Sequence, residues 1–170
     1  HPMISPVAKY SSLRCVRFLA ITLISVAALN PTFSFGKDIV VGQIAPFTGV
    51  QAAAGKAYSA GIKLAFAAQN AAGGVAGATL KLVAADDAYK PDDTVRLARE
   101  LIAKERPVAL AATVGTANAD ALIKAGVLTE SGVPLIGPSS GAGSVIGKPG
   151  VFTVKASYAE EVNQLFSTLN

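Results

Sequence analysis

Two short segments of the chain carry hydroxyl side chains in a setting that suits the binding of an anion. The segment Val114–Asn118 (VGTAN) offers Thr116, and the segment Gly137–Gly143 (GPSSGAG) offers Ser139 and Ser140. Each follows a short apolar stretch, and the first leads directly into a predicted helix. Hydroxyls beside free backbone N–H groups are suited to a carboxylate or a similar anion. In the alternative interpretation, the threonine or the asparagine two residues later only caps its own helix.

The residues that most enzyme chemistry needs are missing from nearly all of the chain. The only histidine is His1 and the only cysteine is Cys15. Residues 37–170 therefore cannot assemble a Ser-His-Asp triad, a Cys-His dyad or a zinc site built on these ligands. The glycine-rich stretches also miss the spacing of a nucleotide phosphate-binding loop. The sequence predicts a protein that is not an enzyme, with no metal site and no cofactor.

One tight acidic pair, Asp86 and Asp87, remains as a candidate for acid–base chemistry. Adjacent residues at the end of a strand point to opposite sides, so the two carboxylates are poorly placed to share one proton. We expect them instead to bond nearby backbone groups and Tyr89.

The excess of positive charge lies at the N-terminus. The chain has a formal net charge of +4, and residues 1–36 contribute +3 of it. The remainder has no run of Lys or Arg and few aromatic side chains, so nucleic acid is not an expected partner.

The first 36 residues have the order of a secretory signal peptide. Three basic residues come first: Lys9, Arg14 and Arg17. The uncharged run Phe18–Leu29 follows; it is too short to span a bilayer and has the length of a signal-peptide apolar region. Small residues then favour cleavage near Ser34–Lys37. We therefore expect export to the periplasm, with a short N-terminal anchor or a buried first helix as the alternative.

Strand and helix patterns alternate through residues 37–170. The stretches predicted as strands are 39–45, 79–84, 108–113, 133–137 and 151–154. The segments predicted as helices are 55–70, one that starts at Pro91, 117–129 and 158–169. In the first helix, the residues expected to face inward are Ala57, Leu64, Ala65 and Ala68. This alternation predicts βαβ units in one lobe, an α/β fold with a doubly wound parallel sheet.

Such a sheet determines where a ligand binds. Ligands of open α/β sheets lie outside the carboxyl ends of the strands, where the strand order reverses. Both hydroxyl-bearing segments follow predicted strands, and a third loop, Pro46–Gly55, follows the first strand. All three loops are therefore expected at the same edge of the sheet.

Several segments together resemble the extracellular solute-binding proteins of ABC transporters, of the leucine/isoleucine/valine-binding type. The resemblance covers residues 39–170 and is carried by IVVGQIAPFTG, NAAGGVAGATLKLVAADDAYKPDDTVRLARELI, ALAATVGTANADAL, GVPLIGPSSGAG and VFTVKASYAEEV. It implies the type I periplasmic-binding-protein fold, with residues 37–170 as its N-terminal lobe.

The resemblance also implies a set of ligand-binding residues. In that family a free amino acid lies between two lobes, and the first lobe holds its α-carboxylate and ammonium groups through hydroxyls and backbone. The positions that match are Thr116, Ala117, Ser139, Ser140 and Gly141.

Two positions depart from the family pattern. The best-known members have a tyrosine in the first loop where this chain has Ala54, and a threonine where it has Gly141. The hydroxyl of Ser140 is expected to substitute for that threonine. The ligand implied is therefore an amino acid or a similar small polar solute rather than leucine in particular.

Family members have two lobes and are more than twice as long as this chain. The resemblance thus implies an N-terminal fragment in which the second lobe is absent. We expect solute binding for delivery to an ABC permease, impaired in the fragment. The alternative is an extracytoplasmic sensory or regulatory domain that binds a ligand with the same fold.

Overall fold

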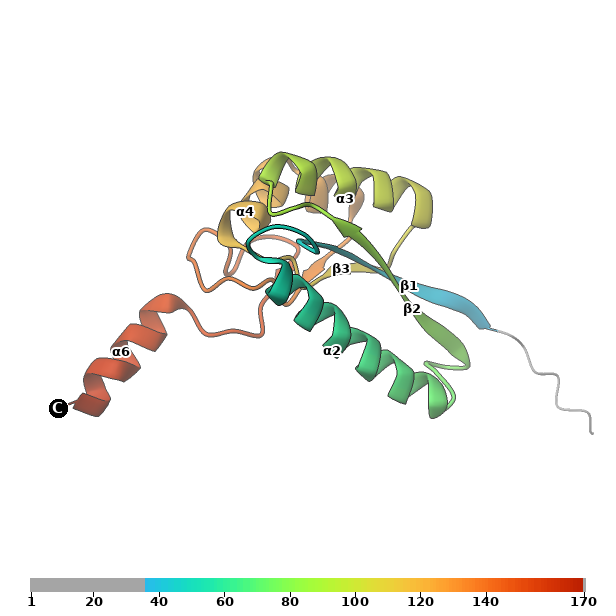
Figure 1. Ribbon diagram of the computed structural model, residues 1–170, viewed down its shortest axis with the longest axis horizontal. Helices are drawn as coiled ribbons and strands as arrows, with labels where there is room; N and C mark the ends of the chain where they lie inside the picture. Colours follow the sequence, from blue (N-terminus) through green and yellow to red (C-terminus); the bar gives the residue numbers. More distant parts are fainter. Residues whose placement is uncertain (1–35, 170) are drawn as a thin grey trace, which may run out of the picture. The chain divides into compact units, whose positions relative to one another are not determined.

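A five-stranded parallel sheet forms the centre of the computed structural model, which describes residues 36–169 (Figure 1). The strands are β1 (Gly36–Ala45), β2 (Ala78–Asp86), β3 (Ala109–Ala111), β4 (Leu135–Ile136) and β5 (Val151–Phe152). Their order is β2-β1-β3-β4-β5, and each neighbouring pair is parallel. The predicted parallel sheet is confirmed, and β2 and β3 flank β1 on opposite sides.

Helices cover both faces of this sheet. The helices are α2 (Ala52–Ala71), α3 (Pro91–Glu105), α4 (Thr116–Lys124), α5 (Val127–Ser131) and α6 (Tyr158–Leu169). Figure 1 shows α2 on one face and α3 on the other, which is the doubly wound arrangement expected from the sequence. Among residues 36–169, no helix combines the length and the apolar character that crossing a membrane requires.

The hydrophobic core lies between the sheet and the helices on the α3 side. Ile44, Leu110 and Leu135 contribute from three neighbouring strands, and each is fully buried. Leu101 of α3 and Leu122 of α4 pack against them. Burial of each such side chain stabilises the fold by about 1.5–3 kcal/mol. This core holds β1, β3 and β4 in the register that brings their carboxyl ends together.

The inward face of α2 was predicted wrongly. All four residues expected to face inward are exposed, and Leu64 is 74% exposed. The buried residues of this helix are Gly55 and Ser59. Alanine occurs on every side of α2, so its pattern of apolar residues marks no face.

Two predicted element boundaries also differ from the structure. The single helix expected over 117–129 is divided into α4 and α5, because Gly126 adopts a left-handed conformation with φ 69°. The strand expected over 108–113 ends earlier, because Ala112 has φ 53° and leaves the extended conformation. The predicted signal peptide, residues 1–36, lies outside the described residues except for Gly36, which begins β1.

The loop after β1 is fixed by the carboxylate of Asp86 at the end of β2. This carboxylate accepts hydrogen bonds from the Thr48 hydroxyl at 2.7 Å and from the Phe47 backbone N–H at 2.8 Å. These bonds, with that of Thr48 the largest cause, lower the pKa of Asp86 to about 2. The acidic pair thus bonds backbone groups, as expected from the sequence.

This lowered pKa predicts a specific acid sensitivity. Because the pKa of Asp86 is depressed in the folded chain, its contribution to stability is present above the ordinary pKa of 3.8 and is lost as the pH falls through about 2. We expect the stability advantage of the parent chain over Asp86→Asn to shrink between pH 4 and pH 2 in urea unfolding followed by circular dichroism. Thr48→Val should weaken the same pH dependence. A constant difference across this range would contradict the assignment.

Candidate functional site

The loops that follow β3 and β4 meet at the edge of the sheet where the strand order reverses. A parallel bridge joins Val114 to Ser139, and the Ser139 N–H donates to the Thr113 carbonyl at 2.9 Å. The loop after β1 begins at the same edge, since β1 lies beside β3 and runs parallel to it. The expected meeting of the two hydroxyl-bearing loops is therefore confirmed.

A pair of hydroxyls lies at the centre of this edge. The Oγ1 atom of Thr116 and the Oγ atom of Ser140 are 2.8 Å apart. Ser140 is fully buried, and the Ala142 backbone N–H donates to its oxygen at 3.2 Å. Thr116 is the first residue of α4, so the backbone N–H groups of this helix N-terminus open beside it. Ala117, the next predicted ligand residue, is exposed on the first turn of α4.

The capping alternative for Thr116 and Asn118 does not hold. Gly115 is the N-cap of α4, and no side chain makes a capping hydrogen bond there. The hydroxyl of Thr116 is directed to Ser140 instead, and Asn118 bonds to Asp87 and Thr94. The hydroxyl of Thr116 thus belongs to the site rather than to its own helix.

Tyr158, which the sequence analysis missed, lies against the same groups. Its backbone N–H donates to the Gly141 carbonyl at 2.9 Å. The pKa of the Tyr158 phenol is lowered, first by the backbone of Gly141 and next by the hydroxyls of Thr116 and Ser140. The Nζ atom of Lys155 lies 5.0 Å from the centre of its ring. Tyr158, the first residue of α6, thus places its ring beside the loop that carries Ser140.

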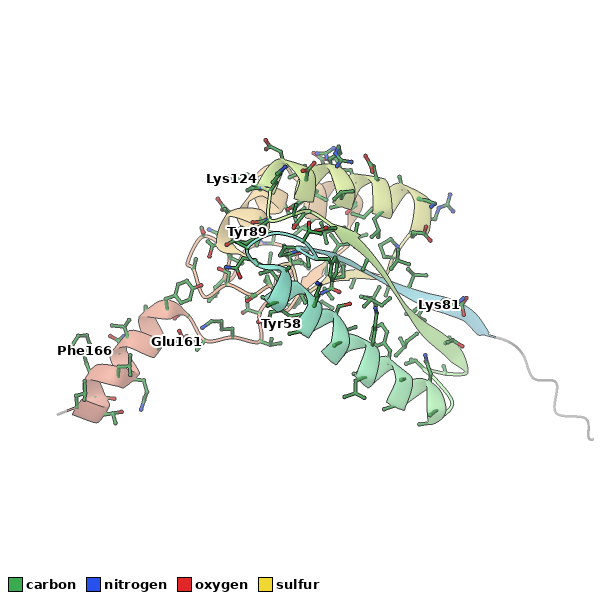
Figure 2. The ribbon with its side chains drawn as sticks, viewed as in Figure 1. Tyr58, Lys81, Tyr89, Lys124, Glu161 and Phe166 are labelled. Carbon is green, nitrogen blue, oxygen red and sulfur yellow. The ribbon has the colours of Figure 1, made fainter. Side chains whose placement is uncertain are left out.

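Ser139 is reached by a second tyrosine, Tyr58 of α2, which the sequence analysis also missed. The Tyr58 hydroxyl donates to Ser139 Oγ at 3.0 Å. Ala54, the predicted first-loop residue, lies inside the first turn of α2 and not in a loop. Tyr58 follows it by four residues, which places the two on one helix face. Figure 2 shows Tyr58 on α2. Ala54 itself contributes no polar group, and the tyrosine one helical turn later contacts Ser139.

A buried polar network holds α4 in place beneath the hydroxyls. Asp87, fully buried, accepts hydrogen bonds from Thr94 Oγ1 at 2.7 Å and from Asn118 Nδ2 at 3.2 Å. It also accepts the Tyr89 backbone N–H at 2.9 Å, as expected from the sequence. The ring of Tyr89 covers Gly115, where a Cβ atom would lie 2.6 Å from it. Gly115, with φ 100°, is therefore required for this close approach.

Several hydrogen-bond donors gather in this site. The hydroxyls of Thr116 and Ser140 lie together at the N-terminus of α4, and the Ala142 N–H and the ring of Tyr158 lie beside them. Such a donor-rich cluster at a helix N-terminus can hold a carboxylate. Among residues 36–169, no three His, Cys, Asp or Glu side chains are grouped as metal ligands.

Comparisons with known proteins agree on one family. Residues 38–169 match the periplasmic binding protein family. An amino acid binding protein from Pseudomonas aeruginosa is 37% identical over 123 residues, which cover 72% of this chain and 32% of that protein. The chain thus spans about a third of the length of the curated relatives it matches.

Solved structures show the same fold. A substrate-binding periplasmic protein from Ralstonia solanacearum is 45% identical with a TM-score of 0.75, over 78% of this chain and 37% of that chain. A branched-chain amino acid transporter substrate binding protein from Streptococcus pneumoniae, solved with isoleucine, is 27% identical with a TM-score of 0.65. That match covers 71% of this chain and 34% of that one. With the sheet order and the family match over residues 38–169, these likenesses show that the chain belongs to the periplasmic binding protein family, with a type I fold.

Proposed function

We propose that the chain forms part of an amino-acid-binding site and that its hydroxyl cluster holds the ligand's α-carboxylate. The observation that carries this proposal is the 2.8 Å pair of Thr116 and Ser140 hydroxyls at the N-terminus of α4. Hydrogen bonds to a charged carboxylate are about twice as strong as those between neutral groups. The substrate-binding role of the family and the isoleucine held by the Streptococcus pneumoniae relative support the proposal.

The ligand's ammonium group and side chain must bind outside the hydroxyl cluster. Tyr58 and Tyr158 flank the cluster and are 42% and 45% exposed, so their rings line an open side of the site. Tyrosine faces attract a cation and cover apolar groups. We place the ammonium group and the side chain of the amino acid on this open side.

The biological role that follows is delivery of the amino acid to an ABC permease from the periplasm. Two observations support it: the match to transporter substrate-binding proteins, and the basic, apolar and small-residue order of residues 1–36. A site for a small ligand buries about 70–90% of the ligand surface. Since both tyrosines remain exposed here, we expect this chain to bind its ligand more weakly than a two-lobed relative.

Amide shifts in nuclear magnetic resonance spectra test the proposal, because they detect weak binding. L-Isoleucine should shift the amides of Gly115 to Ala117 and of Ser139 to Ala142. L-Isoleucinol, which has the ammonium and side chain but no carboxylate, should leave them unchanged.

Single hydroxyl deletions test which residues hold the carboxylate. Thr116→Ala and Ser140→Ala should each weaken isoleucine binding by about 1–3 kcal/mol, because a charged group loses a partner. The matched control is Ser144→Ala, an exposed serine of the same loop region. Ser59 is unsuitable as a control, because it lies on the buried side of α2. Equal losses in all three variants, or shifts caused by isoleucinol alone, would overturn the proposal.

A further inference from the structure

The ring of Tyr158 occupies the space that a side chain at position 141 would need. A Cβ atom on Gly141 would lie 2.8 and 2.9 Å from ring carbons Cδ1 and Cε1 of Tyr158. It would also lie 2.8 Å from the carbonyl oxygen of Ala156. Contacts below 3.0 Å are not tolerated without a shift of the neighbours. Position 141 therefore requires glycine, because the Ala156 carbonyl and the ring of Tyr158 lie directly against it.

We propose that Tyr158 is a ligand-binding residue, whose phenol hydroxyl donates a hydrogen bond to the same carboxylate as Thr116 and Ser140. This inference rests on the proposed function, since it concerns the same carboxylate. The donors then come from three segments: Thr116 at the start of α4, Ser140 in the loop after β4, and Tyr158 at the start of α6.

The start of α6 is built to hold the phenol in this position. Ser157 and Glu160 form a capping box: the Ser157 N–H donates to Glu160 at 2.7 Å, and the Glu160 N–H donates to Ser157 Oγ at 3.1 Å. Together with the bond from the Tyr158 N–H to Gly141, this fixes the first turn against the loop after β4. The backbone of Tyr158 is therefore held beside Gly141 by these bonds.

The phenol gives the site a preference for a negatively charged oxygen. A phenol can donate one hydrogen bond, and its donation to a carboxylate is strengthened by the charge of the acceptor. Lys155 lies over the ring, but its charge is balanced by its partner Glu161. A ligand without a carboxylate gains less from this hydroxyl.

The Tyr158→Phe variant removes only the hydroxyl and leaves the ring on Gly141. In the amide-shift titration of the chain, we expect L-isoleucine to bind about tenfold or more weakly to this variant, and Ser144→Ala to bind as the parent does. If Thr116→Ala weakens binding and Tyr158→Phe does not, the inference on Tyr158 is wrong and the proposed function stands. If neither variant weakens binding, the proposed function fails as well.

A second measurement separates ligand contact from a structural role. The absorbance change on tyrosine ionisation, taken as the difference between the chain and Tyr158→Phe, follows the titration of Tyr158 alone. Saturating L-isoleucine should move this titration to higher pH, because a carboxylate beside the phenol disfavours the phenolate. A titration that L-isoleucine leaves in place would overturn the inference.

Discussion

The Gly55→Ala variant is expected to lose more than about 3 kcal/mol of unfolding free energy, although alanine is the better helix former. A Cβ atom at this position would lie 1.8 Å from the carbonyl oxygen of Pro46 and 2.8 Å from its carbonyl carbon. Both are backbone atoms, so no side chain can rotate away. The first turns of α2 would have to move off the end of β1, and Tyr58 would move with them.

A matched control lies in the same helix. A Cβ atom on Gly61 would have no neighbour within 4 Å, and Gly61 is exposed. Gly61→Ala should therefore stabilise the chain by about 0.5–1 kcal/mol, the ordinary gain from alanine in a helix interior. Urea unfolding followed by circular dichroism measures both variants. Unfolding of Gly55→Ala and Gly61→Ala at the same urea concentration would show that α2 does not approach Pro46 this closely.

The fold could be predicted from the sequence because its signals are local. Short apolar strands alternate with segments of helical spacing, and right-handed crossovers leave few ways to connect them. The edge that carries the site follows from the same rule, since the carboxyl ends of parallel strands share one side. This is why Thr116 and Ser140, 24 residues apart, could be placed together before any contact was known.

The two tyrosines were missed because their positions depend on contacts that no local pattern reveals. Tyr58 reaches Ser139 only because Gly55 and Ser59 let α2 lie close to the sheet, and an alanine-rich helix does not indicate which side is inward. Tyr158 reaches Gly141 only through the course of the chain after β5. Ala54, by contrast, was assigned from a family pattern, and it lies within the first turn of α2.

The points at which β3 ends and the predicted helix is divided depend on single residues in the left-handed conformation. Ala112 ends β3 early at φ 53°, and Gly126 divides the predicted helix at φ 69°. A non-glycine residue with positive φ is uncommon and is held there by the surrounding structure. In Ala112, that structure includes a hydrogen bond from its own N–H to the carbonyl of Ile136 in β4. Such positions cannot be predicted from composition or spacing.

The Asp87→Ala variant is expected to lose more than about 3 kcal/mol of unfolding free energy and, with it, the position of α4. Its carboxylate is fully buried and is shared by a side chain of α3, a side chain of α4 and the backbone of Tyr89. Alanine removes this acceptor from all three donors, and each hydrogen bond to a charged group is worth about 1.5–3 kcal/mol. Asp87→Asn keeps the shape and one acceptor oxygen, so its loss should be smaller.

The control for lost charge is Asp92→Ala, an exposed acid in the first turn of α3. It should cost less than about 1 kcal/mol, the value of an acid at a helix N-terminus. Urea unfolding gives the order Asp87→Ala, then Asp87→Asn, then Asp92→Ala, from least to most stable. Because Asn118 ties Asp87 to the helix that begins with Thr116, the amides of Gly115 to Ala117 should also shift in Asp87→Asn without any ligand. Equal stability of Asp87→Ala and Asp92→Ala would show that the network does not hold α4, and the preset geometry of the hydroxyl site would then need another cause.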